Sequence, residues 1–271
     1  MNQGEDILSI KILIEQINKK FPPSKYHRHK RLWFRGHANE KGKDTWKLTP
    51  GIYRIPSISS ENDREQLERH LAQDFRIQSA ELRRGFNNAS DLYFLQQHYG
   101  MPTRLLDWTN SPLAALFFAV SENHDVDGDI YMMDAYELGP TQKAKYLESR
   151  KDFKGVATDN NPELVRNFKR IIYWDDDLEF SKFIIPARPN YFDKRITLQR
   201  SCFTFHVPAT GKNILDEKSN NTLIRFRIPK EKKPSLNDEL LLLGIDHFSV
   251  FGDLEGLSKS IKSHYKIPLK F

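Results

Sequence analysis

The clearest pattern of hydrophobic and polar positions in the chain begins at Leu92. Leu92, Leu95 and Tyr99 recur at steps of three and four residues, which predicts a helix with one apolar face. Gly100 follows where the C-terminus of a helix favours a left-handed residue, and Pro102 prevents the helix from continuing. This segment is therefore predicted to be a helix that ends in a tight turn.

The residues that follow predict a strand and then a buried helix. Residues 103–108 form a short, partly apolar run, as in a strand. Ser111 and Pro112 are a strong helix start, because the Ser hydroxyl can accept from free backbone amides and Pro fits the first turn. Residues 113–120 have no polar face, so the helix that they form should be buried.

Periodicity elsewhere predicts further helices and strands. Helices are expected at residues 7–17, 61–84, 138–175, 236–243 and 254–262, and strands at 32–37, 45–53, 130–133, 183–187, 195–205 and 223–228. The first helix should begin with Glu5-Asp6 and end with Lys19-Lys20, which suits its dipole. The expected core face of the helix at 61–84 consists of Leu67, Leu71, Phe75 and Leu82.

No internal repeat and no low-complexity linker divides the chain, so one α+β domain over residues 1–271 is the simplest interpretation. It would contain an N-terminal helix and basic loop at 1–30, a core at 31–262 and a polar helical insertion at 138–175 over one face. The pattern predicts a mixed or antiparallel sheet with flanking helices.

Composition supports a globular protein without a membrane segment. Apolar residues make up 38% of the 271 residues, and no apolar run approaches the roughly 20 residues that cross a membrane. No secretory signal is visible at the N-terminus, so a cytoplasmic location is the default expectation. The single cysteine, Cys202, excludes an internal disulfide and a cysteine-based zinc site.

The charge balance favours a polyanionic partner without establishing one. The net charge is +6, but 36 acidic residues are interspersed with 42 basic ones. Residues 25–31 mix basic side chains with Tyr26, and residues 230–233 form a second basic segment. Each of the two segments is interpreted either as a solvated loop or as a contact with nucleic acid.

Generic catalytic and metal-binding motifs do not name a reaction. The nucleophile elbow, the P-loop, the dinucleotide glycine fingerprint and the zinc-protease motif do not occur. Asp125 to Asp129 has the wrong spacing for a calcium loop and predicts a hairpin turn. Residues 175–177 predict an acidic loop, and His27 and His29 a basic-loop pair, so no metal site is expected.

Candidate chemistry gathers at the edges of the strand at 103–108, next to the buried helix. Arg104 and Asp107 could belong to a site there, or could form a structural ion pair with each other. His98 could be a general base, or a packed or capping histidine.

Two motifs resemble the FRG domain family, which occurs in bacteria and phages. They are Phe34-Arg35-Gly36 and the stretch from His98 to Ala119. Further similar segments are residues 48–54, Arg195-x-x-x-Gln199-x-Ser201-x-Phe203, Gly244-Ile245 and residues 251–257, so the resemblance spans about residues 30–262. Ser201 and Gly252 depart from the expected glycine and proline.

The resemblance implies a relation to ADP-ribosyltransferase folds and therefore NAD as the cofactor. Cleavage of the nicotinamide–ribose bond needs donors for the pyrophosphate, hydroxyls for the ribose and a carboxylate for the cationic transition state. On this comparison Arg35 and His37 would hold NAD, and Gly36 would allow close approach of the cofactor. The cofactor-binding candidates are thus Arg35, Gly36, His37, Thr109 and Ser111.

The catalytic glutamate of the related toxins has no counterpart, because Gln199 occupies the comparable place on a late strand. The catalytic candidates are Arg35, Arg104, Asp107 and Gln199. The missing carboxylate could be Asp107, Glu239, Asp253 or Glu255. Alternatively, Arg35 pairs with Asp107 for the fold alone, and Trp33, Phe34 and Trp108 belong to the core.

Together these features predict an NAD-dependent mono-ADP-ribosyltransferase that acts as the toxin of a toxin–antitoxin or anti-phage system. The basic balance favours nucleic acid as acceptor, with single-stranded RNA preferred because its unstacked bases can meet exposed aromatic side chains. A neutralising antitoxin protein would be a partner. The alternatives are a non-catalytic module that binds nucleic acid or nucleotides, and a nuclease.

Overall fold

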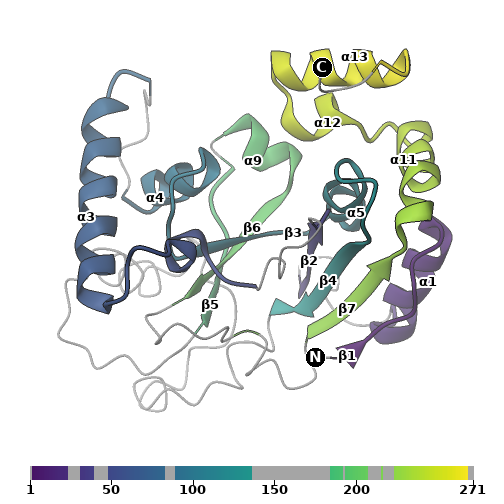
Figure 1. The fold of residues 1–271 in the computed structure, drawn as a ribbon, viewed down its shortest axis with the longest axis horizontal. Helices are drawn as coiled ribbons and strands as arrows, with labels where there is room; N and C mark the ends of the chain where they lie inside the picture. The colour runs from purple at the N-terminus through teal and green to yellow at the C-terminus, as the bar shows by residue number, and fades with distance from the viewer. Residues whose placement is uncertain are drawn as a thin grey trace.

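The computed structural model of the chain describes residues 2–23, 31–39, 48–82, 89–135, 184–191, 193–206, 215 and 223–267. The predicted insertion at 138–175, the acidic residues 175–177 and almost all of the basic segment at 25–31 lie outside these residues. Within them the architecture is α+β, with a seven-stranded sheet and helices on its faces and ends (Figure 1). This confirms the expected α+β class with a mixed sheet and flanking helices.

The strands are β1 (Asn2–Gln3), β2 (Leu32–His37), β3 (Leu105–Thr109), β4 (Gly128–Asp134), β5 (Ile184–Ala187), β6 (Ser201–His206) and β7 (Leu223–Ile228). The helices are α1 (Ile10–Lys20), α3 (Glu61–Gln78), α4 (Ala89–His98), α5 (Pro112–Val120), α9 (Lys194–Leu198), α11 (Lys233–Leu242), α12 (His247–Phe251) and α13 (Leu254–His264). Two short 3-10 helices cover Gly51–Arg54 and Lys230–Lys232. In the described ranges, no helix combines the length and apolar character that a membrane crossing needs.

The strands are ordered β1-β7-β4-β2-β3-β6-β5, and all neighbours are antiparallel except β1 and β7. β2 pairs with β4 along its whole length, and β3 pairs likewise with β6. Between β2 and β3, the described residues form one register pair, Phe34 with Thr109. The sheet therefore has two well-paired parts that diverge on either side of this joint.

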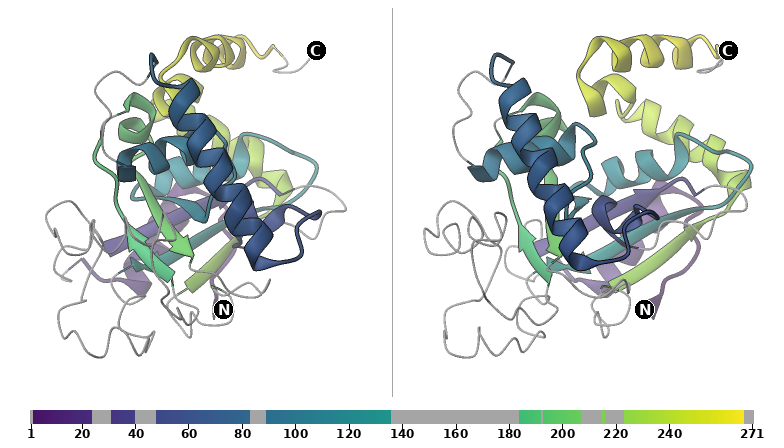
Figure 2. Two further views of the ribbon diagram at one scale, coloured as in Figure 1. Left: turned by 90° about the vertical axis from the view of Figure 1, so that its left-hand side faces the viewer. Right: turned by 60° about the vertical axis from the view of Figure 1, so that its left-hand side comes forward.

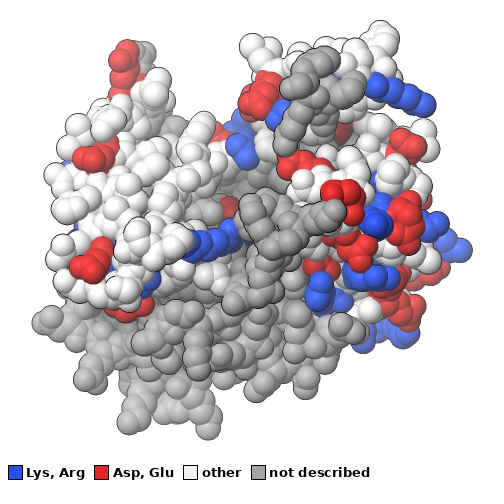
Figure 3. Space-filling model, in the orientation of Figure 1, with Lys and Arg blue, Asp and Glu red and all other residues white. Residues whose placement is uncertain are grey.

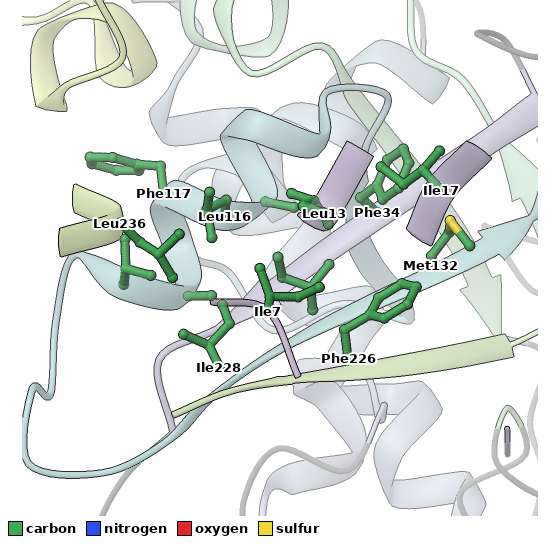
Figure 4. Packing of buried hydrophobic residues seen from close by; sticks show 14 of the residues in the cluster. Ile7, Leu13, Ile17, Phe34, Leu116, Phe117, Met132, Phe226, Ile228 and Leu236 are labelled. Atoms are coloured by element: carbon green, nitrogen blue, oxygen red, sulfur yellow. The ribbon is translucent and has the colours of Figure 1, made fainter. Parts of the chain in front are cut away.

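One face of β2, β4 and β7 is covered by α1, α5 and α11, and the side chains between these layers form the larger core cluster (Figure 4). Phe34, Met132 and Phe226 contribute to this cluster from the strands, and Leu13 and Leu116 contribute from the helices. Alternation along β2 places Trp33 on the opposite face, in a second cluster with Trp108. Trp33, Phe34 and Trp108 thus belong to the core, as the structural alternative expected.

Helix ends follow the capping signals of the sequence in most places. Ser111 accepts from the Ala114 N–H at the start of α5, and Asp253 caps α13. Gly100 has φ 81° after α4. The first helix begins later than predicted, with Ser9 as its cap and no acidic residue in its first turn. The prediction that Glu5 and Asp6 form the start of this helix is therefore wrong.

The inner face of α3 is polar, contrary to the prediction. Its buried residues are Arg64 and Glu68, while Leu82 is 88% exposed. Leu67 and Phe75 are only half-buried. α3 lies beside α4 at the β5–β6 side of the sheet (Figures 1 and 2), and a buried ion pair with Arg104 accounts for its inward polar face.

Two predicted strands are wrong in part. Residues 194–198 form the helix α9, capped by Asp193, and β6 begins only at Ser201. Gly51–Arg54 is a 3-10 helix, where an extended segment was expected. Gly36 lies inside β2. The helix α5 approaches it so closely that a Cβ at this position would lie 1.8 Å from the Ala115 carbonyl oxygen.

Candidate functional site

A cavity of about 380 Å³ lies where β2 and β3 diverge, bounded also by the end of α4, by α5 and by the α9–β6 connection. This size is in the range of small-molecule sites. Its polar lining includes Arg35, Gln97, His98, Asp107, Arg195 and Gln199. Four elements that are far apart in the sequence therefore contribute polar groups to one cavity.

Arg35 bridges the two diverging strands. Its Nε donates to Nε2 of His37 at 2.7 Å, and its Nη1 donates to the Asp107 carbonyl at 2.7 Å. The same Nη1 lies 3.6 Å from Oδ2 of Asp107. The guanidinium thus contacts Asp107, as the alternative of an Arg35–Asp107 pair predicted. It also lines the cavity.

The Asp107 carboxylate is the acidic group of the cavity lining, with 52% of its side chain exposed. Gln97 Nε2 donates to Oδ2 of Asp107 at 2.9 Å, and the side-chain Oε1 of Gln97 accepts from the Thr103 hydroxyl at 2.6 Å. The Thr103 hydroxyl in turn accepts from the Leu105 N–H at 3.0 Å. This chain of hydrogen bonds fixes the carboxylate while leaving half of its surface open.

The two hydroxyls expected to order a ribose are engaged within the protein. Thr109 donates to the Gln199 carbonyl at 2.6 Å and accepts from the Ser111 N–H at 2.9 Å. Ser111 caps α5 and does not line the cavity. Thr109 lines the cavity, where its oxygen retains one acceptor site for a ligand.

Burial and positive charge keep the histidines beside Arg35 neutral. His37 is buried, and its burial together with the charges of Arg35 and Arg54 holds its pKa well below the usual range. Burial and the charge of Arg35 lower the pKa of His206 to about 3. Burial also lowers the pKa of Arg35 itself to about 10, so Arg35 stays cationic at neutral pH. A neutral His37 can accept the Arg35 hydrogen bond through Nε2.

The structure brings five of the predicted site residues to the cavity and places three elsewhere. The five are Arg35, Gly36, Asp107, Thr109 and Gln199. His37 lies behind Arg35 and Ser111 at the start of α5. Arg104 is 1% exposed and pairs with Glu68 at 2.7 Å, so the alternative ion pair of Arg104 with Asp107 is wrong.

The other carboxylates considered for catalysis have structural partners away from the cavity. Glu239 accepts from the Ile10 N–H at 2.8 Å, Asp253 caps α13, and Glu255 pairs with Lys259 at 2.7 Å. Asp107 is the candidate that lines the cavity. Among the described residues, no group of three or more possible ligands could hold a metal ion.

Sequence reasoning did not place Gln97 or Arg195 in the site. Gln97 lies one residue before the motif that begins at His98, so its position next to that motif was a signal that could have identified it. Arg195 was assigned to a strand, and only the helix α9 turns its side chain toward the cavity. His98, left open as packed or catalytic, is buried and lines the cavity.

Residues 30–128 match the family model of the FRG domain. This range contains Arg35, Asp107 and Thr109, and it includes both motifs on which the resemblance was based, whereas α9 and β6 lie beyond it. No curated protein and no solved structure matches the chain.

Proposed function

We propose that the cavity beside Arg35, in the segment at residues 30–128 that matches the FRG domain model, binds NAD in a mono-ADP-ribosyltransferase. The observation that best supports this proposal is the contact between Arg35 of β2 and Asp107 of β3. A cation and a half-exposed carboxylate at one cavity are two of the three features that transfer from NAD needs. The resemblance to ADP-ribosyltransferase toxins supplies the reaction class.

In this mechanism Asp107 stabilises the positive charge that develops on the ribose as the nicotinamide bond breaks. Gln97 holds the carboxylate in place, which avoids reorganisation during the reaction. Arg35 lines the same cavity, where it would bind an anionic part of the ligand. His37 orients Arg35 through the hydrogen bond to Nε.

Nucleic acid, preferably single-stranded RNA, is the proposed acceptor, and an antitoxin the proposed partner of a toxin of this kind. The support is the net charge of +6. On the face shown in Figure 3, basic and acidic side chains alternate over the region of α1, β7 and α11, so that region is not a uniform basic patch. The acceptor contact is accordingly proposed to form near the cavity.

The first prediction is that Arg35→Ala and Asp107→Asn lower NAD turnover while the protein remains folded. A loss of about 10²- to 10³-fold in kcat is expected for each, because each removes electrostatic stabilisation of the transition state. The purified full chain is incubated with labelled NAD and with total cellular RNA and protein. Nicotinamide release and label transfer are measured, and thermal unfolding reports folding.

Arg35→Lys is the matched variant for this test. It keeps the charge but cannot donate to His37 and to the Asp107 carbonyl with the planar fork of arginine, so turnover should also fall. Arg69→Ala, on the exposed surface of α3, should leave turnover unchanged. Folded wild-type protein that neither releases nicotinamide nor transfers label would contradict the proposal and favour a non-catalytic nucleotide-binding module.

A further inference from the structure

Three buried nitrogen atoms at the cavity have no hydrogen-bond partner among the described residues: His98 Nε2, Arg195 Nε and Gln199 Nε2. Folded proteins rarely leave buried donors unsatisfied, and such groups often mark a place that a ligand or an ion completes. The three side chains come from the end of α4 and from α9 with its C-terminal cap. All three line the cavity, Gln199 follows Arg195 by one helical turn, and Arg195 is close enough to His98 for its charge to act on the imidazole.

The His98 side chain is enclosed, with 5% of its surface exposed. The nearest carboxylate oxygen, Oδ1 of Asp193, lies 3.4 Å from its Nε2 without hydrogen-bond geometry. That oxygen already accepts from the backbone N–H groups of Arg195 at 2.9 Å and Ile196 at 3.3 Å. Oδ1 of Asp193 therefore caps α9, and Nε2 of His98 is left buried without a hydrogen-bond partner among the described residues.

Arg195 and Gln199 are held by contacts that leave their donors free. The Arg195 guanidinium stacks on the Phe251 ring at 4.7 Å, and stacking leaves the N–H groups at the edge of the plane. The Gln199 backbone is fixed at both ends, since its N–H donates to the Arg195 carbonyl and its carbonyl accepts from Thr109. The Arg195 side chain and the Gln199 backbone are thus positioned before any ligand arrives.

The charges of the lining favour an anion as that ligand. Arg35 and Arg195 contribute two positive charges, and Asp107 contributes one negative charge. Burial and the charge of Arg195 hold the pKa of His98 below its usual value, so the ring is neutral and donates through whichever nitrogen carries the proton. An acceptor with several oxygens can bind Nε of Arg195, Nε2 of Gln199 and, in the tautomer that carries the proton there, Nε2 of His98.

We propose that His98, Arg195 and Gln199 form a subsite that binds a phosphoryl group of the ligand. This deepens the proposed function, because it rests on the assignment of the cavity as the ligand site. The phosphoryl group can come from the pyrophosphate of a dinucleotide or from the phosphodiester of a nucleic-acid acceptor. Both present the same oxygen atoms to the three donors.

Calorimetric titration of the full chain tests this subsite without requiring turnover. The probes are ADP-ribose, which carries the pyrophosphate, adenosine, which carries none, and a short single-stranded oligoribonucleotide. The variants Arg195→Gln and Gln199→Glu each remove a donor, and the second also introduces a repelling carboxylate. Lys194→Gln is the matched control, because it removes the same charge from an exposed neighbour in α9 that does not line the cavity.

Each subsite variant should weaken ADP-ribose binding roughly 10- to 100-fold, as expected for the loss of a hydrogen bond to a charged group, and leave adenosine binding unchanged. The same loss confined to the oligoribonucleotide would support the subsite and assign it to the acceptor. If neither phosphate-bearing probe binds more weakly to Arg195→Gln and Gln199→Glu than to Lys194→Gln, the subsite is overturned.

Binding and turnover measured together distinguish a failure of the subsite from a failure of the proposed function. Binding of ADP-ribose that depends on Arg195 in a protein without NAD turnover would keep the subsite and reject the transferase. NAD turnover with a KM that is unchanged in both subsite variants would keep the transferase and reject the subsite. Gln199→Glu is nearly isosteric with the native residue, so a folding failure of Arg195→Gln alone would still leave a decisive variant.

Discussion

Arg104 and Glu68 form an ion pair that is almost completely removed from water. Their side chains are 1% and 4% exposed, and Nε of Arg104 lies 2.7 Å from Oε2 of Glu68. The Tyr93 hydroxyl and the Arg104 backbone N–H also donate to the Glu68 carboxylate. A charge buried in this way depends on its partner, since an unpaired ion in the interior is strongly unfavourable.

We expect Glu68→Gln to lower the free energy of unfolding by about 3–5 kcal/mol, because it leaves the Arg104 charge buried without its counter-ion. Urea denaturation monitored by circular dichroism measures this. Glu65→Gln on the same helix is the control: its pair with Arg69 is partly exposed, and its removal should change stability by at most about 1 kcal/mol. Equal losses in the two variants would show that Glu68 contributes no more than a surface pair.

The sequence identified Arg35 but could not identify the partner of Arg104. Arg35 stands in a short motif next to a predicted strand, so its position alone marks it as a candidate. Glu68 lies 36 residues before Arg104 and belongs to a helix whose apolar residues suggested a different inner face. Hydrophobic periodicity assumes that apolar residues face inward, and a buried polar pair violates that assumption.

The packing of α5 on β2 determines the need for glycine at position 36. A Cβ on Gly36 would lie 1.8 Å from the Ala115 carbonyl oxygen and 3.0 Å from the Ala119 N. Gly36 was predicted to admit the cofactor, and it does line the cavity, but contact with the helix is sufficient to explain a residue without a side chain. The close approach also sets the position of Arg35 relative to β3.

Gly36→Ala should therefore destabilise the protein by about 1–3 kcal/mol, because the added methyl group forces α5 away from the sheet. Thermal and urea unfolding measure the loss. Gly244→Ala is the matched control, since its φ of 76° imposes backbone strain but nothing lies within 4 Å of an added Cβ. The control should cost about 1 kcal/mol and leave ligand binding at the cavity intact. Unchanged stability of Gly36→Ala would contradict the helix-packing explanation.

Short segments with alternating residues were the least predictable elements. Residues 195–205 alternate as in a strand, yet Asp193 caps a helix over the first part, and Arg200 adopts φ 48° before β6 begins. A five-residue helix is too short for its period to outweigh an apparent alternation. The error mattered for function, because α9 carries Arg195 into the cavity.

The cavity itself is a property of the whole sheet and could not be read from any segment. It exists because β2 and β3, which are far apart in the sequence, are neighbours joined by one register pair in the described part of the sheet. The strand order brings β6 and α9 beside the motif residues of β3. Sequence patterns predict individual strands, but they contain little information about which strands become neighbours or how far their pairing extends.

Because its buried histidines remain neutral, the protein should lose stability in mild acid. Burial lowers the pKa of His206 to about 3 and that of His37 well below normal, whereas both would titrate near 6.5 in the unfolded chain. The unfolded state therefore binds more protons below pH 6.5, and the free energy of unfolding falls as the pH is lowered toward 3. Each histidine contributes about 1.4 kcal/mol per pH unit, or about 2 kcal/mol between pH 6.5 and 5.

Urea denaturation at half-unit steps from pH 7.5 to 5 measures this dependence above the range in which most carboxylates titrate. In His206→Gln the slope of the unfolding free energy against pH should decrease below pH 6.5 by about 1.4 kcal/mol per pH unit, the contribution of one proton. This change in slope does not depend on the stability of the variant at pH 7. An identical slope in His206→Gln and the wild type would mean that His206 is protonated in the folded protein. The neutral surroundings inferred for Arg35 would then be wrong, because a cationic His206 would repel the guanidinium that bridges β2 and β3.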